Sequence, residues 1–199
     1  MSPLDTPFRP SHGFDHGERD SQAVFRALLW AMSHPGEILQ CPIGCTAPAP
    51  LTPAGAAVAL TLFDGDTSVW LDSSLHDGAA VDYLRFHTNA TLAASPEADF
   101  ALIAEPQAMP TFTRYHTGSA EEPERTTTLV LQVPALTGGP AVALRGPGIE
   151  TTCSIGPQGL PDWFWAAWDE NARLFPRGLD AVLTDGRALI ALARSTSRA

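Results

Sequence analysis

The chain has 199 residues and a net charge of −10, and its twelve basic residues are all arginines, with no lysine. Nucleic-acid binding is not expected, because the arginines are spread along the chain without a basic run that would neutralise phosphates. Without lysine the chain cannot form a Schiff base with pyridoxal phosphate or build a Walker A loop. Any phosphate must therefore be held by arginine, by backbone N–H groups or by a helix N-terminus.

Neither a membrane span nor a secretory signal is visible. No stretch approaches the ~20 apolar residues of a membrane helix, and the first ten residues include Asp5 and Arg9 without an apolar core. A soluble, cytoplasmic protein is therefore expected. The three cysteines, Cys41, Cys45 and Cys153, are an odd number, which favours free thiols over disulfides, and no metal site is expected from them.

Residues 1–18 are rich in Pro and Gly and are predicted to form an arm ahead of a single domain at 19–199. Asp20 and Ser21 can cap a first helix that ends at the turn of Pro35 and Gly36. Its predicted buried face follows the i, i+3, i+4, i+7 spacing and consists of Phe25, Leu28, Leu29 and Met32.

The remaining elements alternate between helix and strand patterns. Helices are predicted at 53–63, 78–86 and 161–175, and strands at 37–41, 67–71, 100–104, 127–133, 141–145, 179–183 and 188–193. The last two strands flank Asp185-Gly186, which is a strong hairpin signal. Residues 105–122 have no decisive pattern. This order predicts a layered α/β fold with a mixed sheet.

Polar side chains gather where the helix at 78–86 is expected to end. Arg85 can hold a phosphate or carboxylate in two parallel hydrogen bonds, and His87 can carry a proton, with Asn89 beside them. The alternative is local: His87 and Asn89 would satisfy the last helix carbonyls, and Arg85 would pair with Asp82.

Further candidates lie at the ends of predicted strands. Arg145 opens the turn Arg145-Gly146-Pro147-Gly148, and Arg177 and Asp180 flank Gly178, which can supply a positive φ between helix and strand. Both segments are also typical structural turns. Asp64-Gly65-Asp66 has two interpretations of its own, a site for a divalent metal ion or a plain turn.

No complete catalytic constellation is present in the sequence. The motifs of serine hydrolases, zinc proteases and dinucleotide-binding folds are all missing, so the catalytic residues stay unassigned. Trp163, Trp165 and Trp168 either pack in the core or anchor a protein interface, and the sequence does not decide between these roles.

An ordered series of segments resembles one family, the PhnH proteins of the bacterial carbon–phosphorus lyase system. The resemblance spans residues 20–196 and is weakest over 105–122. The matching segments are Asp20-Ser21-Gln22, Phe25-Arg26, Ala31-Met32-Ser33-His34-Pro35-Gly36, Leu60-Thr61-Leu62, Asp64, Asp66-Thr67, Val69-Trp70-Leu71, Leu84-Arg85-Phe86-His87-Thr88-Asn89-Ala90, Pro123-Glu124, Thr127-Thr128-Leu129-Val130-Leu131-Gln132-Val133, Leu144-Arg145-Gly146-Pro147-Gly148-Ile149 and Phe175-Pro176-Arg177-Gly178-Leu179-Asp180.

The resemblance implies a three-layer mixed sheet with helices on both faces, similar to the large domain of pyridoxal phosphate-dependent transferases but without that cofactor. It implies no other cofactor and no established catalytic residues. It also implies a homodimer in isolation and a core complex with PhnG, PhnI and PhnJ. That complex takes part in making ribose 1-phosphonate 5-triphosphate from alkylphosphonate and ATP, and then in cleaving the carbon–phosphorus bond.

Two main hypotheses follow for the chain. In the first, it is a non-catalytic assembly component of this machinery, with no activity of its own. In the second, it binds a phosphate-bearing or nucleotide ligand in an arginine-lined pocket where Arg85, His87, Asn89, Arg145, Arg177 and Asp180 converge. A stand-alone enzyme outside phosphonate metabolism is a third possibility, which turnover by the purified chain would reveal.

Overall fold

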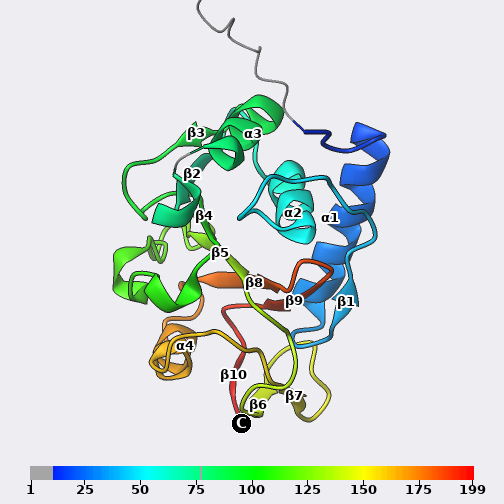
Figure 1. The fold of residues 1–199 in the computed structure, drawn as a ribbon. Helices are drawn as coiled ribbons and strands as arrows, with labels where there is room; N and C mark the ends of the chain where they lie inside the picture. Colours follow the sequence, from blue (N-terminus) through cyan, green and yellow to red (C-terminus); the bar gives the residue numbers. More distant parts are fainter. Residues whose placement is uncertain (1–10, 77) are drawn as a thin grey trace, which may run out of the picture.

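A computed structural model describes residues 11–76 and 78–199 of the chain (Figure 1). Its central feature is a seven-stranded sheet in the order β1–β9–β8–β5–β4–β2–β3. The strands are β1 (Leu39–Gln40), β2 (Ser68–Leu71), β3 (Thr91–Leu92), β4 (Phe100–Ile103), β5 (Thr128–Gln132), β8 (Asp180–Thr184) and β9 (Ala188–Leu192). Neighbours from β3 to β8 are parallel, and β9 is antiparallel to both β8 and β1. The predicted mixed sheet in an α/β fold is confirmed.

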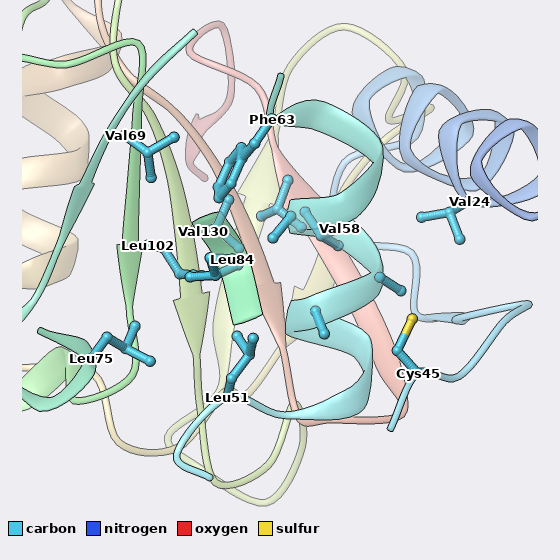
Figure 2. Packing of buried hydrophobic residues seen from close by; sticks show 14 of the residues in the cluster. Val24, Cys45, Leu51, Val58, Phe63, Val69, Leu75, Leu84, Leu102 and Val130 are labelled. Carbon is cyan, nitrogen blue, oxygen red and sulfur yellow. The ribbon is translucent and has the colours of Figure 1, made fainter. Parts of the chain in front are cut away.

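Three helices cover one face of this sheet: α1 (Gly17–Ser33), α2 (Pro53–Leu62) and α3 (Ala79–Thr88). Figure 2 shows α2 packed on the strands, with Val58 and Phe63 near Val130, and Val24 of α1 on the side of α2 away from the strands. Helix α2 begins where the sequence predicts, because Thr52 accepts a hydrogen bond from the N–H of Gly55 and Pro53 fits the first turn.

The other face is covered by a mixture of elements. Helix α4 (Phe164–Ala172) lies there with a second sheet of order β10–β6–β7, formed by β6 (Val142–Arg145), β7 (Cys153–Ile155) and β10 (Ser197–Arg198). Residues 105–122, which had no decisive pattern, contribute the 3-10 turns Pro106–Ala108 and Phe112–Arg114. Trp168 is fully buried in this layer, and its indole N–H donates to the carbonyl of Thr196 at 2.9 Å. Helices on both faces were expected, but the second sheet was not.

The predicted buried face of the first helix is correct for Leu28 and Met32, which pack against the core, and wrong for Phe25 and Leu29. Val24, Leu28 and Ala31 are buried, whereas Phe25 and Leu29 are 45% and 55% exposed. The physical reason is close packing: α1 lies against α2 and β9, where alanines and valines let the helix axes approach. The two larger side chains are left on the outside of the molecule.

The boundaries near the ends of the chain also need correction. Helix α1 starts at Gly17, and Asp20 caps it from inside by accepting the backbone N–H of His16 at 2.8 Å. Of the predicted arm, residues 1–10 lie outside the described residues, and 11–16 run without regular structure up to the helix. Helix α4 is shorter than predicted, because residues 161–163 form a turn before it.

Two turn predictions are confirmed by the backbone. The Asp185-Gly186 segment, together with Arg187, joins β8 and β9 in an antiparallel hairpin, and Gly178, two residues before β8, has a φ of +117°. A third glycine brings two of the family-like segments together. A Cβ on Gly148 would lie 2.0 Å from the carbonyl oxygen of Ser33, so only glycine fits this contact.

Within residues 11–76 and 78–199, no helix combines the length and the apolar character needed to cross a membrane.

Candidate functional site

Two of the candidates at the end of α3, His87 and Asn89, make structural contacts. Asn89 adopts the left-handed conformation with a φ of +55°, and its backbone N–H caps the helix by donating to Arg85 O at 3.1 Å. His87 pairs through Nε2 with the carbonyl of Ser11 at 3.0 Å, tying the chain ahead of α1 to α3. Arg85 is exposed, and none of the ion pairs among the described residues involves it.

Asp180 is already occupied by a partner in the same chain. Arg194 donates its Nε to both carboxylate oxygens, at 3.0 and 3.2 Å, and its backbone N–H donates to Oδ1 at 2.7 Å. The same guanidinium also reaches the carbonyl of Pro123. The ion pair of Arg194 and Asp180 therefore ties β8, the end of β9 and the 118–125 segment together. It leaves the Asp180 carboxylate little hydrogen-bonding capacity for a ligand. Arg177 lies half-buried nearby.

The six predicted site residues do not converge on one pocket. Asn89 lies just before β3, at one edge of the large sheet, while Asp180 begins β8. Four strand spacings separate β3 from β8, which corresponds to roughly 19 Å. Arg145 belongs to the other sheet, on the side of α4. The structure thus divides the candidates into three separate places (Figure 1).

Of the six, His87 borders a cleft of about 350 Å³ next to residues 12–14, and Arg145 lies in a larger one. This arginine cleft has a volume of about 650 Å³ and is bounded by β6, the end of α4 and β10. Its arginines are Arg145, Arg173 and Arg198, and its one acidic side chain is Asp169. The Nε of Arg198 donates to Asp169 Oδ2 at 2.9 Å, and this pairing lowers the pKa of Asp169 below its ordinary value.

A second cleft lies where open α/β sheets usually bind ligands, outside the carboxyl ends of the parallel strands. This carboxyl-edge cleft has a volume of about 480 Å³ and lies beside the ends of β4 and β5 and the start of α2. Its one charged side chain is Glu105, among walls that contain no arginine. A phosphate would therefore meet a like charge here.

The polar groups at this edge are satisfied within the protein. Buried Gln132 accepts hydrogen bonds from the backbone N–H and the hydroxyl of Thr52, each at 2.7 Å, and donates to Pro50 O at 3.1 Å. Buried Asp72, directly after β2, accepts the backbone N–H groups of Ala104 and Glu105, both at 2.8 Å. Asp72 thereby closes the gap between β2 and β4, where the connections depart in opposite directions.

Two further buried groups are held in the neutral form. Burial raises the pKa of Tyr115, and the nearby carboxylate of Asp72 raises it further. Burial also raises the pKa of Cys45 to about 11, with the neighbouring Cys41 as a second cause. A thiol with this pKa is protonated at neutral pH, so Cys45 is not a reactive nucleophile.

The described part of the chain contains no set of side chains suited to bind a metal ion. No group of three or more His, Cys, Asp or Glu side chains there is placed to hold a metal ion. Asp64-Gly65-Asp66 forms a turn closed by local hydrogen bonds, including one from the N–H of Asp66 to Asp64 Oδ1 at 3.0 Å.

Sequence reasoning missed most of the polar residues that matter at both clefts. Asp72 and Gln132 each end an apolar strand, and that position is a usable signal. Arg173, Arg198 and Asp169 offered no such signal, because their proximity depends on β10, a strand of only two residues.

A comparison with protein families assigns the chain. Residues 12–199 match the family model described as "Bacterial phosphonate metabolism protein (PhnH)". This chain belongs to the PhnH family. The match includes residues 105–122, where the resemblance seen in the sequence is weakest.

Two curated proteins are similar to this PhnH chain. The first is "Alpha-D-ribose 1-methylphosphonate 5-triphosphate synthase subunit PhnH" of Rhizobium meliloti (strain 1021). It is 43% identical over 178 residues, which cover 89% of each chain. The second is a protein of Stutzerimonas stutzeri, HtxG, whose name assigns it provisionally to C-P lyase. It is 29% identical over 175 residues, covering 88% of this chain and 84% of the relative.

Proposed function

We propose that this chain is a subunit of an alpha-D-ribose 1-methylphosphonate 5-triphosphate synthase in carbon–phosphorus lyase metabolism, and that it works as a non-catalytic assembly component. One observation carries the proposal: a relative named as that subunit is 43% identical over 89% of both chains. The polar groups of the carboxyl-edge cleft and the ion pair of Asp180 are also engaged in structural hydrogen bonds, which supports a role without catalysis.

The partners in this proposal are subunits of the PhnG, PhnI and PhnJ type, with a homodimer formed by the isolated chain. A fold similar to that of pyridoxal phosphate-dependent transferases, a single domain over residues 19–199 and a cytoplasmic location are part of the same proposal. The absence of lysine supports the cofactor-free half of the fold comparison, because no Schiff base can form.

A surface on α1 is suited to subunit contact, and we assign it to another subunit of the assembly. Four of the six exposed large apolar side chains of the described residues lie on α1 or shortly after it: Phe25, Leu29, Trp30 and Ile38. Phe25 and Leu29 are one turn apart on the same side of the helix. Exposed aromatic side chains of this kind are preferred anchors at protein interfaces.

Co-purification tests the proposal directly. The tagged chain is co-expressed with the PhnG, PhnI and PhnJ type subunits of the same genome, and the mass of the purified material is measured by light scattering. A stoichiometric complex is expected from the wild type. Leu29→Asp is expected to lose the complex, because it places a charge in the apolar surface of α1.

Phe175→Asp is the matched control, since Phe175 is 62% exposed just after α4, which lies on the other face of the large sheet from α1. Circular dichroism confirms that both variants fold. A wild-type chain that purifies without partners contradicts the subunit role. A complex that survives Leu29→Asp keeps the role but contradicts the α1 surface as the contact.

A further inference from the structure

The arginine cleft differs in charge from the rest of the molecule. The chain carries a net charge of −10, yet three of its twelve basic side chains, Arg145, Arg173 and Arg198, line this one cleft. Each comes from a different element: β6, the residue directly after α4, and β10. The fold therefore brings together cations that are 25 or more positions apart in the sequence.

The shape of the cleft follows from small side chains in its walls. Ala141, Ala143 and Ala172 line it together with Ser195 and Ser197. These short side chains leave the volume of about 650 Å³ open, which lies within the ~300–1,000 Å³ typical of small-molecule sites. Serine hydroxyls add hydrogen-bond donors between the arginines.

Most of the hydrogen-bonding capacity of Arg145 is unused. Its Nε reaches the hydroxyl of Ser197 at 3.4 Å, and this is the one side-chain hydrogen bond that it makes to the described residues. It forms no ion pair with any of them. A guanidinium has five N–H donors in a planar fork that matches phosphate oxygens, so four donors remain for a ligand.

The other two arginines are held by acids without being buried. Arg198 pairs with Asp169, and Arg173 pairs with Glu170, three residues before it on α4. Their side chains remain 44% and 70% exposed, respectively. Both guanidinium groups therefore keep donors that are accessible from the cleft, and the acids limit their movement.

We propose that the arginine cleft binds the oligophosphate chain of a small ligand, such as a nucleoside triphosphate or a sugar triphosphate. Three cations across one cleft suit a chain of several phosphates better than a single phosphate, because each arginine can hold a different phosphate group. The choice of a triphosphate rests on the proposed function, since the named product of the relative's enzyme carries a 5-triphosphate. The anion site itself rests on the cleft alone.

Isothermal titration calorimetry of the purified chain with tripolyphosphate and with ATP tests this proposal. Binding is expected to weaken roughly tenfold in Arg145→Ala, because a charge-assisted hydrogen bond is lost. Arg145→Lys is expected to bind between the wild type and Arg145→Ala, since it keeps the charge but not the planar fork. Raising the salt concentration weakens binding in all three proteins.

Arg187→Ala is the control, because Arg187 is exposed in the β8–β9 turn and its charge is the same. It is expected to bind as tightly as the wild type. Equal affinity for tripolyphosphate and ATP supports recognition of the phosphate chain alone, as a sugar triphosphate requires. Tighter binding of ATP supports a nucleoside triphosphate as the ligand.

Three results would overturn the proposal: no binding of either ligand at millimolar concentration, binding that Arg145→Ala leaves unchanged, or an equal loss in Arg187→Ala. If tripolyphosphate does not bind and Arg145→Ala instead releases the partner subunits, the cleft holds an acidic protein segment. If tripolyphosphate binds but no partner co-purifies, the anion site stands and the subunit role fails.

Discussion

Two clefts of this molecule, the carboxyl-edge cleft and the arginine cleft, differ little in size and are opposite in character. The carboxyl-edge cleft lies where parallel sheets usually bind ligands, but its buried polar groups are paired within the protein and its charged side chain is Glu105. The arginine cleft lies outside the large sheet, on the side of α4, and its arginines keep unused donors. Structural hydrogen bonds thus occupy the position where this fold usually binds a ligand, and the clustered arginines lie in the other cleft.

This difference shows why the location of a site cannot be taken from the fold class alone. A buried carboxylate such as Asp72 can bind backbone N–H groups and join two strands, or it can face a ligand, and the hydrogen bonds decide which. In this chain Asp72 accepts the backbone N–H groups of Ala104 and Glu105 just after β4, so its carboxylate has a structural role. Mutations at the two clefts should therefore separate stability from ligand binding.

The largest expected effect is on stability, from Asp72→Ala. This change leaves the backbone N–H groups of Ala104 and Glu105 without their acceptor and removes the acceptor of the Ser74 hydroxyl, 2.6 Å away. We expect the free energy of unfolding to fall by about 3 kcal/mol, measured by urea denaturation. Affinity for tripolyphosphate should not change in the folded fraction.

Asp66→Ala is the matched control, because Asp66 is an exposed acid in a turn. Its free energy of unfolding should stay within about 0.5 kcal/mol of the wild type. If Asp72→Ala were as stable as this control, the carboxylate would not close the gap between β2 and β4. Such a result would reopen the carboxyl-edge cleft as a ligand site.

A smaller effect is expected from Tyr115→Phe, next to Asp72. The Tyr115 hydroxyl is buried and has no hydrogen-bond partner among the described residues, so its removal should raise the free energy of unfolding by about 1 kcal/mol at pH 8. The pKa of Tyr115 is raised above its ordinary value of 10.0. Folding therefore keeps the phenol of Tyr115 protonated, and the stability of the wild type falls as the pH rises above 10.

Urea denaturation at pH 8 and pH 11 measures this loss. Between the two pH values the wild type should lose about 1 kcal/mol more stability than Tyr115→Phe, because only the wild type has this group to ionise. Ionisation of other groups, such as Cys45, lowers the stability of both proteins alike. An identical loss in both would mean that Tyr115 is not buried beside Asp72.

Local signals in the sequence were sufficient for most of the large sheet and its helices. Asp185-Gly186 predicted the hairpin because tight turns depend on adjacent residues. The second sheet was missed because β10 pairs Ser197 with Arg145, 52 residues earlier, and strands of two or three residues have no detectable period. Such pairing is visible only once the chain is folded.

The candidate site was also hard to predict, because its residues meet through contacts between distant segments of the chain. Asp180 looked available in the sequence, but Arg194, at the end of the following strand, neutralises it. Arg145 was predicted as an anion ligand, yet its companions in the cleft, Arg173 and Arg198, come from elements whose contact the sequence does not reveal. The α1 face was misassigned at Phe25 and Leu29 for a related reason, since the sequence does not show that Val24 and Ala31 face α2 and β9.

The smallest stability effect, and the sharpest test of the arginine cleft, is expected from Asp169→Asn. An aspartate is ionised at neutral pH, and the hydrogen bond from Arg198 is the chief cause that lowers the pKa of Asp169 further. Its negative charge therefore opposes any anion in the cleft. Removing the charge should strengthen tripolyphosphate binding about three- to tenfold and free Arg198 for the ligand.

The cost in stability should stay below about 1 kcal/mol at pH 7, because the ion pair is solvent-accessible. A carboxylate with a lowered pKa stabilises the fold above its unfolded pKa of 3.8 and loses this contribution as the pH falls below it. The difference between wild type and Asp169→Asn should therefore vanish in acid. Weaker tripolyphosphate binding by the variant would show that Asp169 positions Arg198 more than it repels the ligand.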